Sequence, residues 1–130
     1  MKQDNSEYAP GQVWLYQSRP GEEKSELLIY KVDALPDLLI YHIAIRGLRL
    51  KSSSDPQAPL IDELPHIPVS RETLDASLTV FLETLNPVPK VNGGYEMWKK
   101  EFDEGNAGFF AVPVAEILEI AQENILSNNS

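Results

Sequence analysis

The feature that most constrains the fold is a pair of apolar runs separated by a short polar segment. Residues 27–32 (LLIYKV) and 38–46 (LLIYHIAIR) are rich in β-branched and aromatic side chains, which favour extended backbone. Residues 33–37 (DALPD) between them have the composition of a hairpin loop. In the second run every second position is apolar, at Leu39, Tyr41, Ile43 and Ile45. The chain is therefore expected to form an antiparallel hairpin.

Two further segments extend this strand-rich region. Residues 11–17 predict a strand that precedes the hairpin. After Gly47 the apolar alternation resumes one residue out of step, with Leu48 and Leu50. A bulge at Gly47 would return both leucines to the apolar face, whereas a turn at Gly47 would begin a separate strand. The sequence is compatible with either arrangement.

The second half of the chain is predicted to be mainly helical. Residues 52–65 are expected to be a long irregular connection, because three consecutive serines and Pro56, Pro59, Pro65 and Pro68 argue against regular structure there. Ser70 is a suitable N-cap for a helix over residues 71–85. That helix would have one apolar stripe, formed by Leu74, Leu78, Phe81, Leu82 and Leu85. Residues 95–104 predict a short helix that ends at Gly105, and residues 108–112 a short strand.

A last helix is expected after Pro113, with an inward apolar face. The residues of that face are Val114, Ile117, Leu118, Ala121 and Ile125. Strands followed by helices indicate an α+β fold, in which an N-terminal antiparallel sheet packs against C-terminal helices. A curled sheet or half-barrel is an alternative for the first fifty residues. The 130 residues are expected to form a single domain, residues 1–130, with disordered ends at 1–9 and 127–130.

The charge is strongly negative and unevenly distributed. Twenty acidic and eleven basic residues give a net charge of −9. Residues 1–60 contain eight acids and seven bases, and residues 61–130 contain twelve acids and four bases, with no base after Lys100. Such a field repels nucleic-acid phosphates and anionic lipid surfaces, and it attracts basic proteins. Acidity of this degree is also common in domains that are simply soluble.

Several function classes lack their sequence signals. The chain has no cysteine, so a disulfide framework and a thiol nucleophile are excluded. No window approaches the roughly 20 apolar residues that a membrane span needs, and residues 1–10 lack the apolar stretch of a signal peptide. We therefore expect a cytoplasmic protein that does not contact membranes. No nucleotide-binding, hydrolase or metal-binding motif is present, so no cofactor and no metal are expected.

Candidate binding residues lie in the two later helices. Glu116, Glu119 and Glu123 are spaced to form one carboxylate stripe on the last helix. The simplest interpretation is a solvated helix face, and the functional one is a contact with a basic protein. Trp98 is a further candidate, because Lys99 and Lys100 follow it in a helix too short to bury every side chain. Residues 103–108 could chelate a cation, but they are more typical of a helix stop.

The only histidines, His42 and His66, are the low-ranking catalytic candidates. Two imidazoles can act as a general base and a general acid, as in metal-free phosphodiester cleavage. Nothing in the sequence indicates that they meet, so structural or surface roles are the simpler interpretation.

Some segments resemble known groups of proteins. The opening Gly11-Gln12-Val13-Trp14 and the later Tyr95-x-x-Trp98 resemble small uncharacterised bacterial proteins, and that resemblance implies no activity. The same opening is similar to the first strand of MazF/PemK-type ribonuclease barrels over about a dozen residues, but the following segment and the net charge differ.

Three functions follow as hypotheses. The first is a non-enzymatic bacterial binding module, of immunity or accessory type, that docks a basic protein partner through its acidic C-terminal half. The second is a small metal-free hydrolase or ribonuclease-like enzyme that uses His42 or His66. The third is a structural or oligomerising subunit that associates through a sheet edge.

Overall fold

The computed structural model describes residues 8–91 and 94–129, which form a five-stranded antiparallel sheet and three helices. The elements in chain order are β1 (Gln12–Tyr16), β2 (Glu26–Leu35), β3 (Leu38–Lys51), β4 (Leu60–Val69), α1 (Arg71–Ser77), β5 (Leu78–Thr84), α2 (Tyr95–Asp103) and α3 (Val114–Asn129). The strand order in the sheet is β4-β3-β2-β1-β5, and the sheet is not closed into a barrel. The predicted α+β class, with an N-terminal sheet and mainly C-terminal helices, is confirmed.

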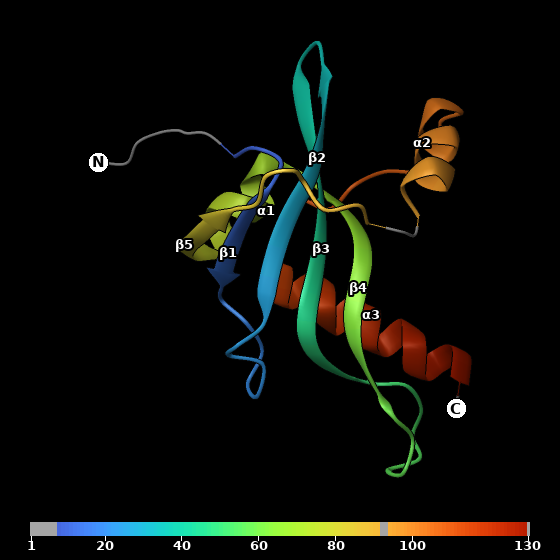
Figure 1. Ribbon diagram of the computed structural model, residues 1–130. Coiled ribbons are helices and arrows are strands. Elements are labelled where there is room, and N and C mark those ends of the chain that lie inside the picture. Colours follow the sequence, from blue (N-terminus) through green and yellow to red (C-terminus); the bar gives the residue numbers. More distant parts are fainter. Residues whose placement is uncertain (1–7, 92–93, 130) are drawn as a thin grey trace.

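The main core lies between one face of the sheet and the helices α1 and α3. In Figure 1 both helices lie behind the strands, whereas residues 85–91, which follow β5, cross in front of them. The core consists mainly of apolar side chains of β2, β3 and β4 that pack against Leu74 of α1 and Val114, Ile117 and Leu118 of α3. Each of these buried aliphatic side chains contributes about 1.5–3 kcal/mol to folding.

The central hairpin is tighter than the sequence predicts. Strand β2 extends to Leu35 and β3 begins at Leu38, so the loop has two residues instead of five. Asp33 therefore lies within β2, where it pairs with Ile40 of β3.

The choice left open at Gly47 is resolved in favour of a bulge. Strand β3 continues to Lys51, and its register with β4 shifts between Arg46 and Leu50. Gly47 has a φ of +79°, a conformation that glycine adopts without steric cost, and Leu48 and Leu50 are both buried.

Two predicted segments have a different structure. The last part of the connection expected over residues 52–65 is a strand, since β4 begins at Leu60 and continues to Val69. Its prolines Pro65 and Pro68 are tolerated because β4 is an edge strand. Only the first half of the helix expected over residues 71–85 exists, since the chain becomes extended at Leu78 and forms β5 on the free edge of β1.

The other helices agree better with the sequence. Helix α2 has the expected position, and Gly105 after it has a φ of +81°. Helix α3 continues to Asn129, so residues 127–129 are helical. The strand expected over residues 108–112 is reduced to one parallel bridge between Phe110 and Val69. Residues 1–7 and 130 of the expected disordered ends lie outside the described residues.

Candidate functional site

The structure brings His42 and His66 together on the sheet face opposite the main core. Nδ1 of His42 lies 3.0 Å from Nε2 of His66, and the two rings are nearly parallel, at 15°, with their centroids 5.2 Å apart. His42 belongs to β3 and His66 to β4, two neighbouring strands of the sheet. The sequence does not predict this pairing, because 24 positions separate the two residues. In addition, the prolines near His66 argue against the strand to which it belongs.

Asp33 completes the chain of polar contacts. Its Oδ2 lies 2.9 Å from Nε2 of His42, and its carboxylate also accepts a hydrogen bond from the hydroxyl of Tyr95 at 3.0 Å. A carboxylate only accepts hydrogen bonds, so Nε2 of His42 carries the proton. In the neutral ring, Nδ1 of His42 then accepts the proton of His66 Nε2. The tautomers of both imidazoles follow from this order.

Aromatic rings of α2 cover the pair. The rings of Tyr95 and Trp98 each lie 4.8 Å from the His42 ring, edge to face, and His42 is 0 % exposed. Burial lowers the pKa of His42, against the opposing effect of the Asp33 carboxylate. Burial and the charge of His42 lower the pKa of His66 to about 4. Both rings are therefore neutral at pH 7.

Trp98 is part of this aromatic cover. Its Nε1 donates to the carbonyl oxygen of Gly108 at 2.8 Å, and its ring stacks on Phe102 with centroids 4.8 Å apart. The structure thus places Trp98 beside the histidines, on a helix that Figure 1 shows well separated from α3. Lys99 pairs with Asp103 and Lys100 with Glu104, within α2 and its C-terminal end.

The three candidate glutamates lie together on the exposed side of α3. Glu116, Glu119 and Glu123 are all exposed. One oxygen of Glu119 lies 3.7 Å from a guanidinium nitrogen of Arg19, and the Glu119 side chain remains 62 % exposed. Among the described residues, this is the only ion pair that the structure gives these carboxylates.

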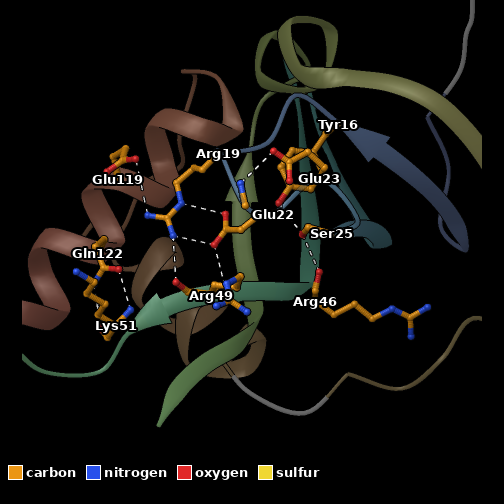
Figure 2. A network of polar contacts seen from close by, with 11 residues as sticks. Tyr16, Arg19, Glu22, Glu23, Ser25, Arg46, Arg49, Lys51, Glu119 and Gln122 are labelled. Atoms are coloured by element: carbon orange, nitrogen blue, oxygen red, sulfur yellow. Dashed lines mark hydrogen bonds and ion pairs between the residues drawn. The ribbon is translucent and has the colours of Figure 1, made fainter. Parts of the chain in front are cut away.

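Arg19 belongs to a partly buried polar network that reaches from the segment after β1 to β3 and α3 (Figure 2). It forms two hydrogen bonds with the carboxylate of Glu22, at 2.7 and 2.9 Å, and Glu22 is only 2 % exposed. Glu22 also accepts the backbone N–H of Arg49, just after the bulge in β3. Nearby, Gln122 of α3 exchanges two hydrogen bonds with the backbone of Lys51. Helix α3 is thus joined to β3 through Gln122 and to Arg19 through Glu119.

The hypothesis of an oligomerising subunit requires an exposed sheet edge. Strand β5 lies at the sheet edge, and Val80, Phe81 and Leu82 on it are exposed, as association through a sheet edge would require. In the part of the chain that the structure describes, no group of three His, Asp or Glu side chains could hold a metal ion. The helices formed by the described residues are too short or too polar to span a bilayer.

Comparison with known proteins gives no match. No family model, no curated protein and no solved structure is similar to this chain. The function must therefore be inferred from the residues described above.

Proposed function

We propose that the protein is a non-enzymatic binding module that docks a basic protein partner through α3, as an immunity-type or accessory protein would. The observation that carries this proposal is the exposed row of Glu116, Glu119 and Glu123 on a helix that contains no lysine or arginine. Exposed charges of one sign on a rigid helix increase the association rate of an oppositely charged partner.

The three glutamates contribute unequally in this proposal. Glu119 is partly neutralised by Arg19, whereas the described residues place no cation beside Glu116 or Glu123. A partner's lysine or arginine would therefore gain most from Glu116 and Glu123, which lie seven positions apart and about two turns along the helix. Glu119 would contribute less, because a partner has to compete with Arg19.

Comparative affinity capture tests this proposal. Three tagged baits are used: the wild-type protein, the double variant Glu116→Lys/Glu123→Lys, and a charge-matched control, Asp37→Lys/Glu83→Lys, whose exposed positions lie on the β2–β3 loop and on β5. We expect one stoichiometric basic protein on the wild-type and control baits at low salt. It should be released by about 0.5 M salt, since screening is then strong, and it should be missing from the α3 variant.

Two results would overturn the proposal. One is a capture with no stoichiometric protein on the wild-type bait. The other is a protein that all three baits retain equally. The charge-matched control is essential because a chain with a net charge of −9 attracts cations without any specific site.

A second candidate, a metal-free hydrolase, is favoured by one observation, the hydrogen-bonded chain Asp33–His42–His66. The lowered pKa of His66 makes it a weak general base, and His42 has no access to solvent. Assays of phosphodiester and ester hydrolysis between pH 5 and 8 test it. Turnover by the wild-type protein that is lost in His66→Gln would support this candidate, and equal rates would exclude it.

A further inference from the structure

A groove of about 410 Å³ lies between the outer edge of β4 and helix α3. Strand β4 contributes Leu64 and Ile67 to its lining, and Phe110 contributes from the segment before α3. From α3 the lining residues are Ile117, Ile120 and Ala121, at the i, i+3, i+4 spacing of one helix face. The size is in the range of pockets that bind ligands.

The groove is apolar and uncharged. Its polar side chains are His66, at the end nearer α2, and Asn124 on α3. His66 donates its one proton to His42 and is neutral at pH 7, so it brings no charge to the lining. Ile120 is 38 % exposed at the rim, an apolar side chain that the protein itself leaves partly uncovered.

The carboxylates of α3 lie directly beside this apolar surface. Ile120 follows Glu116 by four positions and precedes Glu123 by three, so both acids are its neighbours on the helix surface. Strand β4 and helix α3 both lack lysine and arginine. An apolar anchor of a partner would thus enter the groove in a field that favours cationic flanks.

The β4 edge indicates how a partner would bind. Pro65 lines the groove and has no N–H to offer to an added strand. The far end of the edge is occupied by Phe110, which accepts the N–H of Ser70 and donates to the carbonyl of Pro68. A partner is therefore not expected to add a strand to the β4 edge. It would instead contact the groove through its side chains.

We infer that the groove binds a bulky apolar side chain of a basic, amphipathic segment of the protein partner, while Glu116 and Glu123 pair with the lysines or arginines that flank it. This inference rests on the proposed function and specifies the partner: charge attracts it, and the apolar anchor determines which basic segment stays bound.

Two synthetic peptides of equal length and charge test the inference. One has lysines and leucines at amphipathic helical spacing, and the other has serine in place of every leucine. Their dissociation constants are measured at low salt by titration calorimetry, with NMR shift mapping of the binding surface. We expect the leucine peptide to bind at least tenfold more tightly, with shifts centred on Ile117, Ile120 and His66.

Three variants identify the site. Ile120→Gln should remove most of the tenfold preference for the leucine peptide and leave the serine peptide unchanged. Met97→Gln is the matched control, because Met97 is 72 % exposed on α2 outside the groove, and it should change neither affinity. Glu116→Lys/Glu123→Lys should weaken both peptides. Thermal unfolding of each variant confirms that the fold is retained.

The failures of the two proposals can be distinguished. If neither peptide binds, or if the glutamate variant binds both as the wild-type protein does, the acidic docking face is wrong. If both peptides bind with equal affinity, or if Ile120→Gln and Met97→Gln behave alike, the acidic face stands and the groove has no role as an anchor site.

Discussion

Nε2 of His66 lies 3.0 Å from Nδ1 of His42, so these two imidazoles share a single hydrogen-bonding proton. The arrangement is stable only while at least one ring is neutral, because two cations at this separation repel each other strongly. Asp33 on the far side of His42 favours one added proton, and Lys31 and Lys99 oppose it. The pair therefore links the stability of the sheet and α2 to pH.

We predict that the protein loses stability as the pH falls from about 6.5 to about 4. The pKa of His66 is about 4 in the folded protein and its ordinary value is 6.5, so the unfolded chain binds a proton in this range that the folded protein does not. The free energy of unfolding should be highest above pH 7 and decline through this window. Urea unfolding at half-unit pH steps measures it.

The control for this effect is His66→Gln, whose amide can still donate to His42 but does not titrate. Its free energy of unfolding should decline less steeply between pH 6.5 and 4 than that of the wild-type protein. Equal slopes would show that the protonation of His66 does not cause the acid sensitivity.

Replacing Asp33 by Asn should lower the pKa of His42 further. The hydrogen bond and charge of Asp33 are the contributions that raise this pKa, and the variant removes the charge while keeping the shape. Loss of the charged acceptor from His42 and Tyr95 should also cost about 1.5–3 kcal/mol of stability. NMR titration of the imidazole signals and urea unfolding measure the two effects.

Asp37→Asn is the matched control, since Asp37 lies exposed in the loop of the same hairpin. It should leave the His42 pKa and the stability unchanged. Equal effects of the two variants would mean that the Asp33–His42 contact has no energetic importance.

The hairpin could be predicted from sequence because its signal is local. Tyr41, Ile43 and Ile45 alternate along one strand, and no distant residue is needed to recognise the pattern. The helix spacing of Glu116 and Glu123 is local in the same sense, so their shared exposed side was also foreseeable.

Strand β5 was missed because its residues satisfy two patterns. Leu78, Phe81 and Leu82 fit a helical stripe, but Thr79-Val80-Phe81 also has high strand propensity, and the free edge of β1 decides the outcome. Its pairing partner, β1, lies more than sixty residues earlier in the sequence, and a local pattern contains no information about a partner so distant.

His42 and His66 are candidates from the sequence alone, but the participation of Asp33 and Tyr95 is not predicted, for a related reason. Asp33 was assigned to a loop, where its orientation towards the β3 side chains could not be inferred. A longer second strand, ending at Leu35, places Asp33 opposite Ile40 in the hairpin. Ile40 is two positions from His42, so this register is the sequence signal that could bring Asp33 near His42. The contact with Tyr95 joins residues 62 positions apart, which no local pattern predicts.

We predict that Glu22→Gln destabilises the protein by about 3 kcal/mol. Glu22 is a buried acceptor for the guanidinium of Arg19 and the N–H of Arg49, and glutamine would turn an NH2 donor towards one of them (Figure 2). A buried ion pair that loses one partner leaves the other charge uncompensated. Chemical unfolding provides the measurement.

The exposed pair Arg46–Glu26 is the control for this prediction. These side chains are 69 % and 31 % exposed and 2.6 Å apart, so Glu26→Gln should cost less than about 1 kcal/mol. Similar costs for Glu22→Gln and Glu26→Gln would contradict the role of burial.

The last prediction concerns the two glycines at the ends of α2. Gly94 and Gly105 have nearly the same φ, +86° and +81°, so alanine is strained at both. An added Cβ at Gly94 would lie 3.1 Å from Cβ and 3.2 Å from Nδ1 of His66, whereas at Gly105 it would meet nothing within 4 Å. Backbone strain is thus common to both variants, and the contact with His66 occurs in only one.

Gly94→Ala should therefore be the more destabilising of the two. Because the added methyl group displaces either α2 or His66, this variant should also shift the NMR signals of His42 and His66, and Gly105→Ala should leave them unchanged. Comparing the two variants by thermal unfolding and imidazole NMR separates the contact from the strain. Equal loss of stability with unchanged imidazole signals would show that α2 does not pack on the histidine pair through Gly94.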